Sequence, residues 1–368
     1  TFNNNGSIQI TENTVLYNYG VFINADAKGA SLIVKGEFDN LYVSGYSGAF
    51  TNKALGSLSL FDSGSYIADQ FTSTTNYGKI EINGSNAKIE VYSLTNHGTI
   101  NNLGGTFIGV DLTNSSTGTM FNDLYANWTC GTSDWSKLDN EGSFTNLYYL
   151  YINHKCVFTN KSGATFLNKG ITYIGENDGT APFGKLLNQG TVTNSGESAK
   201  IILTSNGTNT EGVYLLNDNG AVLTNAQGGV IELGLYSGLY NTGTIEHING
   251  VIQPNSTTGS GSLVNYKFGD SNDPGVINKY CAGSITLPDT RYFGPPPVDL
   301  CAGTIVINKS TELYLGDDFT FTGSGRLGTF ILDGDWDTTV PSTRTFSGLS
   351  LGTYTVTEAE ASGFTLTN

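Results

Sequence analysis

Residues 76–83 read Asn-Tyr-Gly-Lys-Ile-Glu-Ile-Asn, and residues 96–102 read Asn-His-Gly-Thr-Ile-Asn-Asn. In both stretches an asparagine stands two residues before a glycine, and a short run with alternating apolar side chains follows. Such a run is typical of a short β-strand, and asparagine and glycine are typical of the turn before it. Looser copies of the motif lie at residues 18–24, 140–146, 160–168, 187–194, 219–225 and 240–249.

The spacing of this motif predicts a solenoid. Gly78, Gly98, Gly118 and Gly142 follow one another at intervals of 20, 20 and 24 residues. A strand this short cannot bury its apolar side chains alone, whereas coils stacked about 4.8 Å apart share one continuous core. We therefore expect an all-β chain with a parallel β-solenoid over residues 1–268. Positive φ angles would explain asparagine and glycine at the corners, and stacked asparagines would form hydrogen-bonded ladders. An ordinary β-sandwich rich in hairpins is the alternative.

The composition agrees with a folded β-protein. The chain has 20 Tyr and 19 Phe, which disordered chains lack, and 48 Gly in 368 residues. Its net charge is −15, and no cluster of basic residues is present, so we expect no nucleic-acid partner. We find no apolar run long enough to span a membrane. Thr1 is expected to be a processed N-terminus or a truncation point.

The repeated corners give the first resemblance. Residues 1–268 resemble the right-handed parallel β-helix regions of bacterial and archaeal surface proteins and adhesins. The pattern changes at the turn-rich residues 269–275, and residues 295–297 are three consecutive prolines. We expect residues 269–303 to form a disulfide-closed connector or cap.

The C-terminal sequence gives the second resemblance. Residues 345–358 read Thr-Phe-Ser-Gly-Leu-Ser-Leu-Gly-Thr-Tyr-Thr-Val-Thr-Glu. This stretch resembles the prealbumin-like (SpaA/Cna-B-type) domains of cell-surface proteins, which implies a small structural β-sandwich over residues 304–368. Lys309 and Glu358 match the lysine and the acid of an isopeptide bond found in some members. The chain ends before the strand that normally supplies the asparagine partner, so the domain is expected to lack its last strand unless the chain continues.

The four cysteines suggest an extracellular protein. Cys130, Cys156, Cys281 and Cys301 form two pairs that are local in sequence, which favours the disulfides Cys130–Cys156 and Cys281–Cys301 among three connectivities. Four buried free thiols are the alternative. No spacing typical of zinc ligands or of a redox motif is present.

We find no catalytic constellation in the sequence. His97, His154 and His247 lie far apart, and surface or strand positions explain them. The weak candidate for a metal site is a Ca²⁺ loop with Asp333, Asp335 and Asp337, which a plain solvated loop explains equally well. We therefore expect no enzyme and no cofactor.

Two surface features remain. The tyrosines of residues 148–151 would stack either on sugars or on one another in the core. Asn-x-Ser/Thr sequons suggest a glycoprotein, and those in expected turns, such as Asn114, Asn127 and Asn255, are the favoured acceptors. The candidate acceptors are Asn5, Asn83, Asn114, Asn127, Asn160, Asn206, Asn255 and Asn308.

Together these features predict a non-catalytic extracellular structural protein, a subunit of a cell-surface filament, sheath or stalk. Its expected partners are copies of itself, with surface glycans as a further candidate. The alternative is an adhesin or carbohydrate-binding protein on the same scaffold, and a polysaccharide lyase or hydrolase of the β-helix type is the third hypothesis. Fold alone does not separate these hypotheses.

Overall fold

The computed structural model describes the chain except for residues 26, 44–45, 124, 131–135, 153–154, 176–183, 205–212, 235, 256–260, 266–274, 280–283, 300–302, 311–317, 325–326, 334–339, 350–352 and 360–368. It divides into two compact units. The first comprises Thr1–Asn278 and Ala282–Val298, and the second comprises Lys279–Cys281 and Asp299–Asn368. Each unit is described by itself.

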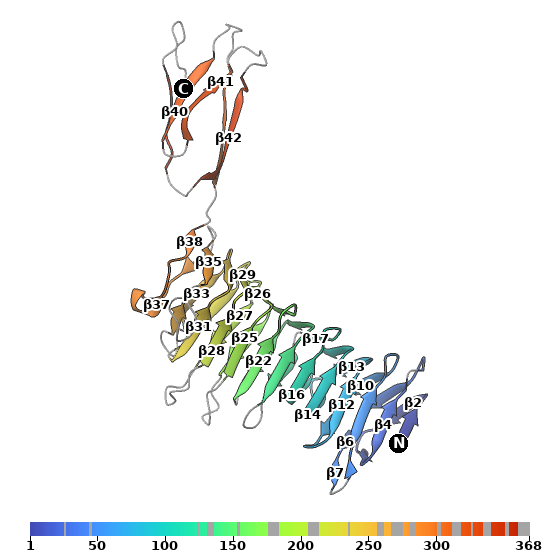
Figure 1. Cartoon of the computed structure of the whole chain (residues 1–368). Coiled ribbons are helices and arrows are strands. Elements are labelled where there is room, and N and C mark those ends of the chain that lie inside the picture. Colours follow the sequence, from blue (N-terminus) through green and yellow to red (C-terminus); the bar gives the residue numbers. More distant parts are fainter. Residues whose placement is uncertain are drawn as a thin grey trace. The chain divides into compact units, whose positions relative to one another are not determined.

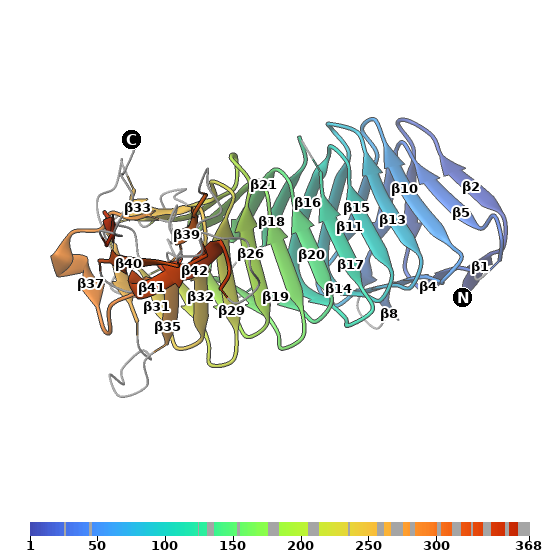
Figure 2. The same cartoon turned by 90° about the horizontal axis from the view of Figure 1, so that it is seen from above.

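The first unit is a parallel β-solenoid (Figures 1 and 2). It has three faces, here named A, B and C in the order in which the chain reaches them, and each coil contributes strand residues to every face. Face A contains β1 (Phe2–Asn4), β4 (Val21–Asn24), β9 (Ala49–Asn52), β12 (Ser73–Asn76), β19 (Lys137–Asn140), β22 (Cys156–Asn160), β25 (Gly184–Asn188), β28 (Val213–Asn217), β31 (Ser237–Asn241), β34 (Ser262–Val264) and β37 (Tyr292–Phe293). Face C contains β3 (Val15–Asn18), β6 (Glu37–Asn40), β11 (Ser65–Ala68), β18 (Asn127–Cys130), β21 (Tyr149–Ile152), β24 (Ile171–Ile174), β27 (Lys200–Leu203), β30 (Val230–Leu233), β33 (Val251–Pro254) and β36 (Ser284–Ile285). The long strands β14 (Lys88–Asn96) and β16 (Thr106–Asn114) run from face C into face A and join the two faces into one sheet.

Face B is a separate 13-stranded sheet. Its strands are β2 (Ser7–Ile10), β5 (Ser31–Val34), β10 (Ser57–Phe61), β13 (Lys79–Asn83), β15 (Thr99–Asn102), β17 (Thr119–Asn122), β20 (Ser143–Asn146), β23 (Thr165–Asn168), β26 (Thr191–Ser195), β29 (Val222–Ala226), β32 (Thr244–His247), β35 (Val276–Lys279) and β38 (Val298–Asp299). A hairpin of β7 (Tyr42–Val43) and β8 (Tyr46–Ser47) and the short 3-10 helix η1 (Asp289–Arg291) complete the unit. The predicted solenoid is confirmed, but the boundary predicted at residue 268 is too early, because β35 to β38 still belong to solenoid sheets.

Strict register builds the core. In β10 and β13, Leu58 lies beside Ile80 and Leu60 beside Ile82, so inward apolar side chains stack in columns along the axis. All four are fully buried. Burial of each such side chain contributes about 1.5–3 kcal/mol to the stability of the fold. Because each side chain packs against the coils on both sides, neighbouring coils stabilise one another. This mutual stabilisation explains why strands of four or five residues are stable here.

Asparagine ladders run along two inner edges of the solenoid, as the sequence predicts. On the first, at the ends of the face A strands, each Nδ2 donates to the Oδ1 of the next asparagine at 2.7–2.9 Å. Its members are Asn4, Asn24, Asn52, Asn76, Asn96, Asn114, Asn140, Asn160, Asn188, Asn217, Asn241 and Asn265. The last amide donates to the carbonyl of Pro295. The ladder therefore crosses the solenoid without a gap.

The second ladder lies at the ends of face B strands and begins at Asn102. It continues through Asn122, Asn146, Asn168, Asn194 and Asn225 with Nδ2–Oδ1 distances of 2.8–3.0 Å. His247 takes the next position, where its Nδ1 lies 3.3 Å from the Nδ2 of Asn225 and its Nε2 lies 3.0 Å from the carbonyl of Ser284. Since a carbonyl only accepts, Nε2 carries the hydrogen and Nδ1 accepts from asparagine. The expected strand position of His247 is thus a ladder position.

Positive φ explains only some of the corners: Gly163 and Gly220, in the motif copies at residues 160–168 and 219–225, have φ angles of 81° and 79°. It does not explain the corners at the ladder asparagines or at the glycines that set the repeat. None of the ladder asparagines, nor Gly78, Gly98, Gly118 or Gly142, is among the described residues with positive φ. Glycine is required there because the coils approach closely. A Cβ on Gly98 would lie 2.1 Å from the carbonyl oxygen of Gly78, and a Cβ on Gly142 would lie 2.2 Å from that of Gly118.

The second unit contains two small antiparallel sheets. β39 (Gly303–Asn308) pairs with β42 (Thr343–Leu349), and β40 (Phe319–Gly323) lies between β41 (Gly328–Leu332) and β43 (Val356–Glu358). Phe319, Phe321, Phe330 and Leu332 are buried, and side chains of β39 and β42 pack against them. The prealbumin-like assignment of residues 304–368 stays a prediction.

Candidate functional site

A group of tyrosines on face C is the candidate site, with Tyr125 exposed and the other four half-buried. We name it the tyrosine surface, and it consists of Tyr125, Tyr148, Tyr149, Tyr151 and Tyr173. Strand alternation sets its orientation, because Leu150 and Ile152 of β21 are fully buried. The tyrosines between them therefore point outward. The expectation that they stack in the core is wrong, although they do stack on one another.

The rings form a continuous chain of contacts. Tyr151 and Tyr173, on neighbouring coils, are nearly parallel, with 5° between their planes and 5.4 Å between their centroids. Tyr149 lies 5.9 Å from Tyr151 and 4.1 Å from Tyr148. Tyr125, in the turn before β18, lies 5.7 Å from Tyr148 at an interplanar angle of 50°. Desolvation, together with the neighbouring phenols, raises the pKa of Tyr148 above its ordinary value.

The neighbours in register with β21 are uncharged. Asn127 and Ile171 flank Tyr149, and Thr129 lies beside Tyr151 on the preceding coil. The surface thus combines phenol, amide and hydroxyl groups with aromatic faces. Such a combination suits a ligand that has both apolar faces and many neutral hydrogen-bonding groups.

Tyr125 has an unfavourable backbone conformation. Its φ is 70°, in the left-handed region, and its side chain is 77% exposed. The N–H of Ala126 donates to the carbonyl of Asp123 at 3.2 Å, so Tyr125 is the third residue of a tight turn. For a bulky residue this conformation costs about 1–2 kcal/mol.

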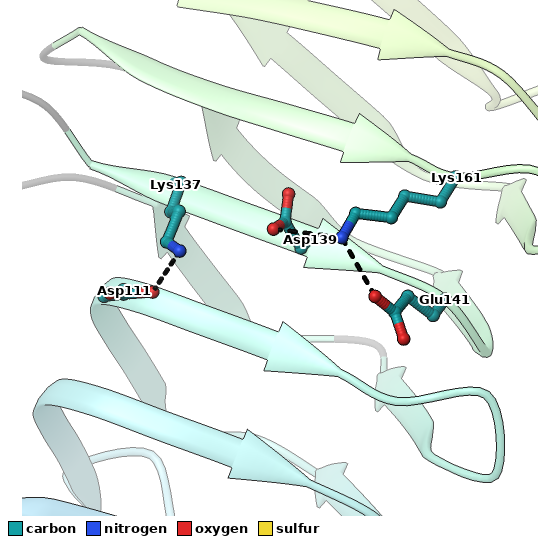
Figure 3. A network of polar contacts seen from close by, with 5 residues as sticks. All are labelled: Asp111, Lys137, Asp139, Glu141 and Lys161. Carbon is teal, nitrogen blue, oxygen red and sulfur yellow. Dashed lines mark hydrogen bonds and ion pairs between the residues drawn. The ribbon is translucent and has the colours of Figure 1, made fainter.

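Face A carries a network of ion pairs across three successive coils (Figure 3). Lys137 bonds Asp111 at 3.3 Å, and Lys161 bonds both Asp139 at 3.3 Å and Glu141 at 2.9 Å. The hydrogen bond to Glu141 raises the pKa of Lys161. These side chains are partly exposed, so each ion pair contributes about 0–1 kcal/mol to the free energy of unfolding. The network ties coils together and leaves the carboxylates bonded to lysines.

The predicted site residues have different positions. Cys130 at the end of β18 and Cys156 at the start of β22 form a disulfide with Cα atoms 5.9 Å apart, as the local pairing predicts. By lowering the entropy of the unfolded chain, a disulfide that closes a loop of this size stabilises the folded protein by about 3.5 kcal/mol. Cys281 and Cys301 lie outside the described residues. His97 stacks on Tyr77 at 4.7 Å, a surface position, and His154 lies outside the described residues.

In the second unit, Lys309 and Glu358 come together, with Nζ 2.8 Å from Oε1. Both side chains are 16% exposed, and Nζ also lies 3.9 Å from the centre of the Phe319 ring. The isopeptide bond itself stays a prediction. Asp333 is buried, whereas Asp335 and Asp337 lie outside the described residues. Among the residues described, no group of three or more metal-binding side chains occurs.

Three of the predicted glycosylation acceptors are buried in the folded solenoid, which counts against them. Asn114 and Asn160 are fully buried members of the first ladder, so their amides are not accessible to a transferase. Asn255 is 8% exposed and donates to Glu232 at 3.0 Å. The accessible candidates on described segments are Asn5, Asn83, Asn127 and Asn308. Asn206 lies outside the described residues.

Comparisons with known proteins add a limited finding. No family model and no curated protein matches the chain. A crystal structure of a TibC-catalysed, hyper-glycosylated TibA fragment is similar, with a TM-score of 0.39 and 12% identity over 81% of this chain and 96% of that chain. No helix in the described part of the chain has the length and apolar character needed to cross a membrane.

Proposed function

We propose that the chain is a non-catalytic extracellular surface protein whose solenoid is a rigid scaffold for adhesion. The observation that carries this proposal is the unbroken first ladder, from Asn4 to Asn265, inside a solenoid whose strands turn alternate side chains outward. Buried amides that hydrogen-bond from coil to coil fix the register of the whole unit. A scaffold of this kind holds surface side chains at fixed spacings.

The disulfide supports an extracellular location. Cys130 and Cys156 are both fully buried and joined within the solenoid. Disulfides persist in oxidising environments and are rare in the cytosol.

Adhesion is favoured over a filament subunit by the tyrosine surface. Exposed, clustered aromatic side chains are typical of recognition surfaces. The described carboxylates of the face A network are bonded to lysines, which suits a structural role better than acid–base chemistry. A lyase would need carboxylates or a basic residue free to act on a bound sugar.

The test compares assembly with adhesion. The purified full chain is examined by sedimentation velocity, and beads coated with it are tested for binding to cells and to immobilised polysaccharides. We expect a monomer and specific bead adhesion. Concentration-dependent polymers together with no adhesion would contradict the proposal and favour the filament subunit.

A further inference from the structure

We infer that the tyrosine surface is a binding site for a neutral oligosaccharide and that Tyr125 is its principal contact residue. This inference rests on the adhesion proposed above. Two observations carry it: the geometry of the rings, with Tyr125 the most exposed, and the uncharged neighbours of β21. The backbone conformation of Tyr125 decides which substitution tests it.

The conformation of Tyr125 is met by glycine in other turns of the solenoid, and by Asn13, Phe71 and Tyr236 in three more. In the turns closed by Ala164 N–H to Lys161 O and by Ala221 N–H to Asp218 O, the third residue is Gly163 or Gly220. Their φ angles are 81° and 79°, and a Cβ on either would meet nothing within 4 Å. Glycine is present there because of φ alone.

Tyrosine in the same turn position is unfavourable for folding. A side chain that is 77% exposed gains little from burial, so packing does not offset the cost. Strain of this kind, kept at an exposed position, is a feature of functional sites. Phe71 and Tyr236 carry the same strain and are also exposed, so strain alone does not single out Tyr125. Tyr125 is singled out by its ring contact with Tyr148, which joins it to the other rings of the tyrosine surface.

The geometry leaves the Tyr125 ring available. Tyr149, Tyr151 and Tyr173 are stacked, so parts of their faces are covered by one another. Tyr125 is tilted by 50° to Tyr148 and is the most exposed ring of the group. Its free face can stack on the C–H face of a pyranose ring, while the stacked tyrosines line the path of the following sugar units.

Charge and polarity favour a neutral ligand. The residues in register with Tyr149 and Tyr151 are Asn127, Ile171, Thr129 and Tyr173, none of which is a carboxylic acid, a lysine or an arginine. Amide, hydroxyl and phenol groups match the hydroxyls of a neutral sugar, and an anionic sugar would find no cation among these residues. The occupant we assign is a neutral oligosaccharide of another molecule.

The experiment uses the full chain made in bacteria that attach no glycan to Asn127. Cellohexaose, chitohexaose, mannohexaose and xylohexaose are titrated by calorimetry against the wild type, Tyr125→Gly and Tyr236→Gly. Tyr236 is a matched control, because it also has a positive φ (60°) and an exposed side chain (55%) but belongs to another turn, before β31. Thermal unfolding of all three proteins is recorded in parallel.

We expect at least one of the four sugars to bind the wild type and Tyr236→Gly with equal affinity. The same sugar should bind Tyr125→Gly about tenfold more weakly, because this variant lacks one stacking contact. Both variants should unfold at the wild-type temperature or above it, since glycine relieves the strained φ. A merely structural role for Tyr125 predicts lower unfolding temperature instead. No binding of any of the four sugars, equal binding by all three proteins, or equal loss in both variants would overturn the site. Bead adhesion that persists in Tyr125→Gly would overturn the site and leave the proposed adhesion intact.

Discussion

Replacing Asn114 by leucine would break the first ladder in the middle of the solenoid. Asn114 accepts from Asn96 at 2.8 Å and donates to Asn140 at 2.7 Å. Its Nδ2 also donates to the carbonyl of Ser143 at 3.1 Å and lies 3.2 Å from the carbonyl of Gly118, which shares one of its two hydrogens. Leucine is similar in size, so the change removes hydrogen bonds without a large cavity. At about 1 kcal/mol for each bond, less the gain from apolar burial, the expected loss is about 3 kcal/mol.

The assay is urea unfolding combined with native-state hydrogen exchange, because a repetitive unit can open locally before it unfolds globally. Protection of the backbone amides from exchange should fall most in the coils that carry β16 and β19. The matched control is Thr113→Ala, on the outer side of the same strand, which should change stability by less than about 0.5 kcal/mol. Equal effects of the two substitutions would refute the reasoning that the ladder stabilises the solenoid.

Three further changes test other parts of the description. Gly98→Ala should destabilise the solenoid by about 2 kcal/mol or more, as its Cβ would lie 2.1 Å from a carbonyl of the preceding coil; an unchanged midpoint in urea would contradict this. His247→Asn should complete the second ladder and leave stability unchanged or higher, whereas His247→Leu should lower it, as measured by thermal unfolding. Desolvation, then hydrogen bonding to Glu37, raises the pKa of Asp39 from 3.8 to about 7. Its proton is held more tightly when folded, so stability should fall as pH rises from about 4 to 7. Asp39→Asn should flatten that pH profile, and an unaltered profile would count against the assignment.

The sequence was sufficient to predict the solenoid because one residue type recurs at one position. Asn76 and Asn96 stand at equivalent strand ends, and their hydrogen bond in the structure follows from that equivalence. The reason for the glycines was not predictable from spacing. Gly98 is fixed by the distance to the carbonyl of Gly78, which only the stacked coils define. Propensity for positive φ describes a residue alone, and here the neighbouring coil decides.

The site was harder to predict for a related reason. In a strand buried on one side, Leu150 and Tyr151 alternate, but the sequence does not say which of them faces inward. Likewise Asn114 and Asn127 are both sequons, and only the register places the first in the ladder and the second on the surface. The conformation of Tyr125 had no sequence signal. The strained φ is visible only in the structure, where the same turn position is held by glycine in some turns and by Phe71 or Tyr236 in others.

An experimental structure of the full chain crystallised with the sugar that binds best tests the central claim most directly. We expect the ladder amides, from Asn4 to Asn265, at hydrogen-bonding distance inside a parallel solenoid, and a pyranose ring against the exposed face of Tyr125. A solenoid without the ladder, or a sugar bound away from face C, would contradict the account.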